Sequence, residues 1–260
     1  MPSDVRSAAA IIGNAARLVV LTGAGVSTES GIPDFRSPGG IWSKYDPREF
    51  TFDRFCASAE VRRGYWEMGA SLYPLLRDAA PNAAHRALAA LERRGGLQRI
   101  VTQNIDGLHQ KAGSSPERVI EIHGTALAVT CLTCGWRTDR DTIQTRFAAG
   151  DVDPRCACGG LLKPATVSFG QAMPERETAQ AFTDARAADA FLVVGSSLVV
   201  YPAASLPGVA VERGAPLVIV NREETPYDPY AAVVLHGSAG ESLGAIAAEL
   251  GLALDRELDS

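Results

Sequence analysis

The 260-residue sequence lacks several features that mark common non-enzymatic classes of protein. No apolar run approaches the roughly 20 residues that a membrane-spanning helix needs. Basic residues are not in excess, and the formal net charge of -5 disfavours non-specific nucleic-acid binding. Residues 1–14 are rich in alanine and lack the charged region and long apolar core of an export signal. We therefore expect a short amphipathic helix there, and a cytoplasmic, monomeric protein that binds neither membranes nor nucleic acid.

Cysteines are few, and four of the five lie close together. Without an export signal a disulfide framework is disfavoured, and clustered cysteines in an intracellular chain favour a metal site. One pair has C-x-x-C spacing, whereas the second pair is C-x-C, one residue shorter. Four thiolates suit a closed, structural zinc site, although the short pair leaves one ligand open, and reduced thiols without metal are the alternative. The predicted zinc ligands are Cys131, Cys134, Cys156 and Cys158.

Short, β-branched apolar runs alternate with helical stretches along most of the chain. This alternation predicts an α/β fold, with an open, mostly parallel sheet that has helices on both faces. The expected strands are residues 18–21, 99–102, 119–122, 191–194, 217–220 and 232–235, and the expected helices are 82–94, 175–188, 202–213 and 241–250.

Two stretches interrupt the alternation. Residues 31–80 hold no clear strand and several aromatic residues, and residues 125–170 hold the cysteine cluster. We interpret both as insertions that form a smaller second domain. Residues 1–30, 81–124 and 171–260 then form the larger domain.

Glycine or polar residues follow nearly every expected strand. They are Gly23-Ala24-Gly25, Gln103-Asn104-Ile105-Asp106, His123-Gly124, Gly195-Ser196-Ser197 and Asn221-Arg222. Ligands of open α/β sheets bind outside the carboxyl ends of the strands, so this convergence predicts a nucleotide site. The glycine turn alone is a weak signal, because a tight turn without a ligand would look the same. No strand ending in Asp or Glu follows about 20 residues later, which disfavours a hydride-transferring dehydrogenase.

Of the histidines, His123 stands at a strand end, where a side chain that titrates near neutral pH can act as a base. The alternative is a structural histidine. His85 and His109 fall in helical stretches; we interpret His85 as structural and leave His109 open.

Together these segments resemble the sirtuin family of NAD-dependent protein deacylases over about residues 15–245. The resemblance is carried by Gly23-Ala24-Gly25-Val26-Ser27, Gly31-Ile32-Pro33-Asp34-Phe35-Arg36, Thr102-Gln103-Asn104-Ile105-Asp106, His123-Gly124, the cysteines, Phe169-Gly170, Gly195-Ser196-Ser197-Leu198 and Val220-Asn221. It implies a Rossmann-like domain, a small zinc domain with structural Zn²⁺, NAD as a consumed co-substrate, and acyl-lysine proteins or peptides as substrates. The acyl group would pass to ADP-ribose as nicotinamide is released.

The resemblance also implies roles for single residues. His123 would be the general base, assisted by Asn104 and Asp106, and an extended substrate peptide would pair with Val167, Ser168, Phe169 and Gly170. The implied NAD site comprises Gly23, Ala24, Gly25, Ser27, Asp34, Phe35, Arg36, Gln103, Asn104, Ile105, Asp106, Gly195, Ser196, Ser197, Asn221, Arg222 and Ala239.

Some residues depart from the family pattern. Ser168 and Gln171 replace the aromatic and acidic residues often found beside Phe-Gly, and Met68 stands where members that prefer acidic acyl groups carry the arginine of Tyr-x-x-Arg. We therefore expect short neutral or longer apolar acyl groups to be preferred over succinyl. A mono-ADP-ribosyltransferase, a non-catalytic nucleotide sensor and a zinc-ribbon nucleic-acid module are the alternatives, the last disfavoured by the acidic charge.

Overall fold

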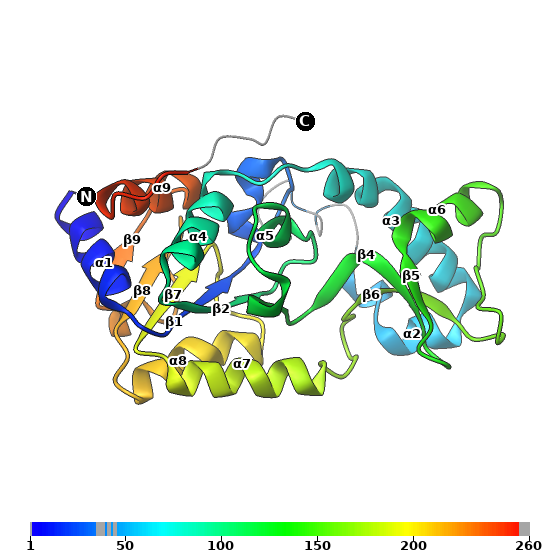
Figure 1. The fold of residues 1–260 in the computed structure, drawn as a ribbon. Helices are drawn as coiled ribbons and strands as arrows, with labels where there is room; N and C mark the ends of the chain where they lie inside the picture. Colours follow the sequence, from blue (N-terminus) through cyan, green and yellow to red (C-terminus); the bar gives the residue numbers. More distant parts are fainter. Residues whose placement is uncertain (1, 35–39, 41–42, 44–45, 255–260) are drawn as a thin grey trace.

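The computed structural model describes residues 2–34, 40, 43 and 46–254, in which two β-sheets organise the chain (Figure 1). The strands of the larger sheet are β1 (Leu18–Thr22), β2 (Leu97–Thr102), β3 (Val119–Glu121), β7 (Ala190–Val194), β8 (Leu217–Val220) and β9 (Val233–Leu235). All are parallel, in the order β3-β2-β1-β7-β8-β9. The expected α/β class with a parallel sheet is confirmed.

Helices cover both faces of this sheet, as expected (Figure 1). One face packs against α1 (Pro2–Asn14), α4 (Ala83–Arg94) and α9 (Ala239–Glu249), and the other against α7 (Glu175–Ala187) and α8 (Leu206–Glu212). Each face of the sheet has its own hydrophobic core, and alternate residues of β1 pack into one or the other. Leu18 and Val20 face the first group of helices, and Val19 and Leu21 face the second. Because both faces are buried, the strands are continuous apolar runs.

The expected helix over residues 202–213 is divided. Residues Ala203–Ser205 form the 3-10 turn η6, and α8 begins at Leu206 with Pro207 in its first turn. Proline has no N–H to donate to a preceding turn, so it favours the start of a helix. The other expected elements are present, with ends that differ by at most two residues.

The second sheet is antiparallel, in the order β5-β4-β6, and consists of β4 (Gly124–Cys131), β5 (Arg137–Asp139) and β6 (Leu162–Thr166). Three helices accompany it: α2 (Phe52–Ala57), α3 (Ala59–Asp78) and α6 (Arg140–Ala148). Trp66 of α3 packs with Val129, Ile143 and Leu162 in a separate small core. A smaller second module is therefore present, while its predicted boundaries stay a prediction.

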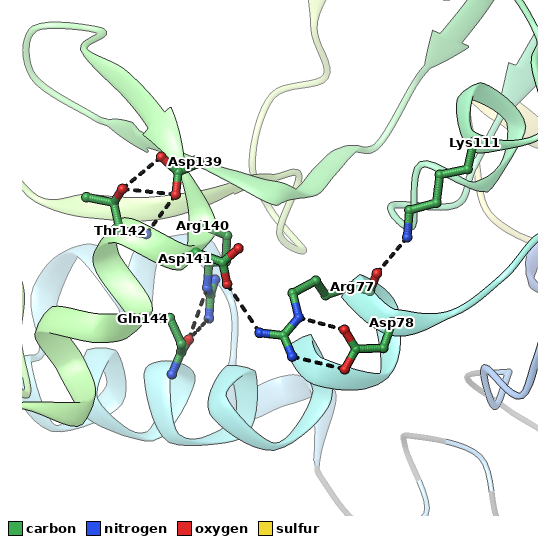
Figure 2. A network of polar contacts seen from close by, with 8 residues as sticks. All are labelled: Arg77, Asp78, Lys111, Asp139, Arg140, Asp141, Thr142 and Gln144. Atoms are coloured by element: carbon green, nitrogen blue, oxygen red, sulfur yellow. Dashed lines mark hydrogen bonds and ion pairs between the residues drawn. The ribbon is translucent and has the colours of Figure 1, made fainter. Parts of the chain in front are cut away.

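A polar network joins the two modules where α3 ends (Figure 2). Lys111, in α5 (Leu108–Lys111) of the larger module, donates from Nζ to the carbonyl oxygens of Arg77 at 2.7 Å and Ala79 at 3.2 Å. Arg77 in turn reaches Asp141 of α6 at 3.5 Å. The carboxyl end of α3 is thus tied to both modules.

Among the helices that the structure describes, none combines the length and the apolar character of a membrane span.

Candidate active site

A cleft of about 840 Å³ lies at the carboxyl ends of the parallel strands, between the two modules. It contains every predicted site residue that the structure describes, apart from the cysteines. These lining residues are Gly23, Ala24, Gly25, Ser27, Asp34, Gln103, Asn104, Ile105, Asp106, His123, Val167, Ser168, Phe169, Gly170, Gly195, Ser196, Ser197, Asn221, Arg222 and Ala239. Phe35 and Arg36 lie outside the described residues.

The glycine turn packs directly against the loop that follows β7. The Gly23 amide donates to Val194 O at 3.0 Å and the Gly25 amide to Gly195 O at 2.9 Å. A Cβ on Gly25 would lie 2.7 Å from Gly195 Cα, so a side chain there would separate the two loops. Two short 3-10 turns, Ala24–Val26 and Thr28–Ser30, follow β1, in place of the long helix of a dinucleotide-binding turn. Close loop packing is therefore one physical reason for these glycines.

Ser27 is the centre of a buried polar network below the cleft. Its Oγ donates to Asp106 Oδ2 at 2.8 Å and accepts from Asn104 Nδ2 at 3.0 Å. The other Asp106 oxygen accepts the Leu108 amide at 2.9 Å. Burial raises the pKa of Asp106, although these hydrogen bonds oppose the shift. The network fixes the Asn104 and Asp106 side chains before any ligand binds.

Two buried histidines lie beside this network: His85 contacts Ser27, and the His109 ring packs against the His85 ring. His85 Nδ1 accepts the Asn82 amide at 3.3 Å, which leaves Nε2 as the protonated nitrogen, 3.4 Å from Ser27 Oγ. His109 Nε2 lies 2.9 Å from Thr22 Oγ1. Burial lowers the pKa of His109 to about 4 and that of His85 well below its ordinary value, so both rings are neutral at pH 7. His85 caps α4, which agrees with the structural role expected for it.

His123 differs because its ring faces the cleft. Its Nδ1 lies 3.1 Å from the carbonyl oxygen of Gln103, which can only accept, so Nδ1 carries the proton. Nε2 is then the basic nitrogen of the neutral ring. Burial lowers the pKa of His123, and the bond to Gln103 partly offsets this. A half-buried ring that is neutral at pH 7 can accept a proton in the cleft.

Most of the cleft residues that α3 contributes were not predicted from the sequence. Met68, Leu72, Leu75 and Leu76 lie along one face of α3 with Tyr65 and line the same cleft. Their three- and four-residue spacing is the signal that could have identified this apolar face. Val199 and Tyr201, beyond Ser197, line the cleft as well and are 51% and 67% exposed.

Comparison with known proteins identifies the family. The model described as "SIR2: Sir2 family" matches residues 23–202, which is more than half of the chain. The chain belongs to the Sir2 family. The NAD-dependent protein deacetylase 1 of Bradyrhizobium diazoefficiens is 46% identical over 247 residues, which cover 93% of this chain and 96% of the relative. The NAD-dependent protein deacylase 2 of Archaeoglobus fulgidus is 44% identical over 252 residues, covering 96% and 97%.

Solved Sir2 structures have the same fold. One of them, described as "Structural Basis for the Mechanism and Regulation of Sir2 Enzymes", superposes with a TM-score of 0.86 at 44% sequence identity. The superposition covers 96% of this chain and 99% of the related chain. Another, a histidine-to-alanine Sir2 variant with deacetylated p53 peptide and 3'-O-acetyl ADP ribose, has a TM-score of 0.88 at 37% identity, covering 96% and 100%. The predicted sirtuin resemblance is confirmed.

The cysteine cluster of this Sir2 protein fits a tetrahedral metal. Its four sulfur atoms all lie within 4.8 Å of one another, with Cys131 to Cys158 at 3.6 Å and Cys134 to Cys156 at 3.7 Å. Zinc–sulfur bonds of about 2.3 Å place tetrahedral sulfurs about 3.8 Å apart. Both thiols of the short C-x-C pair reach the cluster, and the turn that holds them is closed by the Gly159 amide, which donates to Cys156 O at 2.9 Å.

None of the four cysteines lines the cleft of this Sir2 protein. The cluster is consistent with structural zinc that would be held by four thiolates, with no position left for a substrate. The zinc would contribute to the folding of the small module rather than to chemistry.

Proposed function

We propose that this Sir2 protein is an NAD-dependent protein-lysine deacylase that transfers the acyl group to ADP-ribose and releases nicotinamide. The observation that carries the proposal is the shared cleft, in which the His123 ring and the glycine turn from Gly23 to Gly25 line one space. The curated relatives named above are NAD-dependent deacetylases or deacylases, and a related structure contains an acetylated ADP-ribose.

The proposed reaction uses the residues of the cleft in order. The acyl oxygen of the modified lysine attacks the ribose carbon that bears nicotinamide; a carbon–oxygen bond forms as the carbon–nitrogen bond to nicotinamide breaks. His123 Nε2 then takes the proton of a ribose hydroxyl, which attacks the resulting imidate carbon. Water completes the release of free lysine and O-acyl-ADP-ribose.

We assign positioning of NAD to the network below the cleft. Ser27 uses its one donor and its acceptors within the protein, so the side chains of Asn104 and Asp106 keep fixed orientations, in which they would contact the nicotinamide and ribose. Such prior ordering avoids reorganisation during reaction and supports charge development in an enclosed site. The remaining residues of the proposed NAD site, which are the glycine turn, Gly195 to Ser197, Asn221, Arg222 and Ala239, would bind the rest of NAD.

The substrate peptide would lie along residues 167–170. Residues 167 and 168 continue from β6 toward the cleft, and residues 169 and 170 form a turn in which the Gln171 amide donates to Ser168 O at 3.0 Å; Phe169 is 46% exposed there. An extended peptide can pair with such a segment through backbone hydrogen bonds, which read main chain more than sequence.

Incubation of the protein with NAD and an acetyl-lysine peptide, followed by mass spectrometry, tests the proposal. We expect deacetylated peptide, nicotinamide and O-acetyl-ADP-ribose in equal amounts. A mass gain on a protein acceptor with no loss of acetyl would instead support mono-ADP-ribosylation, which begins by cleaving the same bond.

We further propose that neutral acyl groups are preferred over succinyl, because α3 presents Met68 and three leucines to the cleft. The expected order of kcat/KM on a peptide panel places acetyl and apolar acyl groups above succinyl. Met68→Arg should raise the succinyl rate relative to acetyl, since it adds a cation beside Tyr65. An unchanged ratio of the two rates in the variant would remove Met68 from the acyl pocket.

A further inference from the structure

Lys163 in β6 is fully buried, with 0% of its surface exposed. Lysine is almost never fully buried unless it is paired, because its ammonium group is costly to remove from water. Among the described residues no carboxylate forms an ion pair with it. Its Nζ instead donates to the carbonyl oxygens of Thr166 and Pro164, and lies 5.6 Å from the centre of the Tyr65 ring.

The carbonyl of Thr166 belongs to the peptide unit that joins Thr166 to Val167. The N–H of that unit, on Val167, donates to the carbonyl oxygen of His123 at 2.8 Å. One peptide unit is therefore held at its oxygen by an ammonium group and at its N–H by the backbone of the proposed general base.

This junction requires a close approach of two strands. Gly124, directly after His123, is the register partner of Thr166. A Cβ on Gly124 would lie 2.0 Å from Ala165 O, and its φ of 75° also favours glycine. The start of β4 and the end of β6 thus meet where His123 and the peptide segment 167–170 leave them.

We infer that Lys163 is a positioning residue: through the Thr166–Val167 peptide unit it fixes segment 167–170 against the backbone of His123. A charged donor on the carbonyl strengthens the hydrogen bond that the same peptide unit donates, because hydrogen bonds in series polarise one another. Lys163 would thereby set the register between a bound peptide and the base. This inference rests on the proposed function for the meaning of segment 167–170.

Arg140 provides a matched control within the same module. It is also buried, at 2% exposure, and its guanidinium lies 4.5 Å from the Trp66 ring and bonds to Gln144. The hydrogen bonds and ring contacts of Arg140 within the described residues involve Gln144, Trp66 and Tyr73, and none involves residues 164–171. Loss of the Arg140 cation should destabilise the small module without changing the hold on the peptide segment.

The experiment compares Lys163→Met and Arg140→Met with the wild type in the full, zinc-loaded protein. Hydrogen exchange followed by mass spectrometry reports on residues 164–171. We expect exchange there to be at least about tenfold faster in Lys163→Met, the ratio that loss of a hydrogen bond to a charged group implies. Arg140→Met should keep the wild-type rate in that segment.

A second measurement uses kcat/KM on two substrates, a long acetyl-lysine peptide and acetyl-lysine with blocked ends. Only the long peptide can pair with segment 167–170. Lys163→Met should therefore lose about tenfold or more on the long peptide and less than about threefold on the blocked amino acid. Where Lys163→Met does not fold, Lys163→Gln, which keeps a donor without the charge, serves in both measurements.

Unchanged exchange at residues 164–171 overturns the inference, as does an equal loss on both substrates. A wild-type protein that deacylates neither substrate overturns the proposed function instead, and the exchange measurement still decides whether Lys163 holds the segment.

Discussion

At the scale of single residues, the neighbours of His123 keep its ring neutral and leave Nε2 free of a proton, so that it can accept one. Because Gln103 O takes the Nδ1 proton and burial lowers the pKa of the ring, the neutral form predominates at pH 7. The neutral, proton-accepting form of a histidine with a lowered pKa is lost only when the pH falls through that lowered value. We expect kcat/KM to be constant above pH 7 and its acid midpoint to lie below about 6.5, the ordinary value for histidine.

The check is a pH profile of kcat/KM together with His123→Ala. The variant should lose about 10²- to 10⁴-fold in rate, the range typical of general-base catalysis, and should bind NAD with nearly wild-type affinity. An acid midpoint above 6.5, or a variant that keeps its rate, would contradict the assignment.

The sequence could place a side chain in the cleft where that side chain follows the end of a strand, while its role there stays a prediction. Asn104, His123 and Asn221 could be assigned to the cleft because parallel strands bring their carboxyl ends to one edge. The partners of Ser27 could not be assigned, since Asp106 is 79 residues away and a hydrogen bond leaves no local pattern. Lys163 was missed for the same reason, as its partners are backbone carbonyls.

At the scale of elements, the turn from Cys156 to Gly160 carries a prediction about metal. From the C-x-C spacing alone, one of its two cysteines was uncertain as a zinc ligand. In the structure both thiols lie in the four-cysteine cluster. We expect one zinc per chain, and loss of that stoichiometry in both Cys156→Ser and Cys158→Ser, because a site short of one thiolate binds zinc weakly. Cys56→Ser, outside the cluster, is the control, and zinc content by atomic emission is the measurement. Full zinc occupancy in either cluster variant would show that its thiol is not a ligand.

The contact between α5 and α3 gives a second prediction at this scale (Figure 2). Lys111 bonds to two carbonyls at the carboxyl end of α3, where a helix attracts cations. Lys111→Met should lower the free energy of unfolding by about 1 kcal/mol, a modest value because the side chain is exposed. Since Leu75 and Leu76, in the last turn of α3, line the cleft, the KM for peptide should rise more than the KM for NAD.

Lys111→Arg, which keeps the charge, is the matched variant. Urea unfolding and steady-state kinetics measure both effects. Equal stability of the Met and Arg variants would show that the charge of Lys111 does not hold α3.

At the scale of the whole molecule, the alternation of strands and helices was enough to predict the fold class and the expected strands. It did not give the strand order, because each strand of a buried parallel sheet is the same kind of apolar run. The small module was predicted only by exclusion. Within its sheet, Arg137–Asp139 has no apolar pattern, so the sequence marked the module only by the cysteines and by the aromatic stretch of residues 31–80 that holds no clear strand.

The stability of the whole chain should depend on acidity through the buried histidines. His109 has a pKa of about 4 when folded and 6.5 as its ordinary value, so the unfolded chain binds protons first as the pH falls. Stability is therefore full above about pH 6.5 and declines until about pH 4, by at most about 3 kcal/mol from this one ring. His85 acts with the same sign, and Asp106, whose pKa is raised, acts with the opposite sign.

A comparison of the wild type with His109→Gln isolates the effect of His109, because the contributions of His85 and Asp106 to the pH dependence are the same in both proteins. Urea unfolding at pH 7 and near pH 4 should show a smaller loss in the variant, whereas equal losses in both would mean that His109 is not held neutral in the folded core.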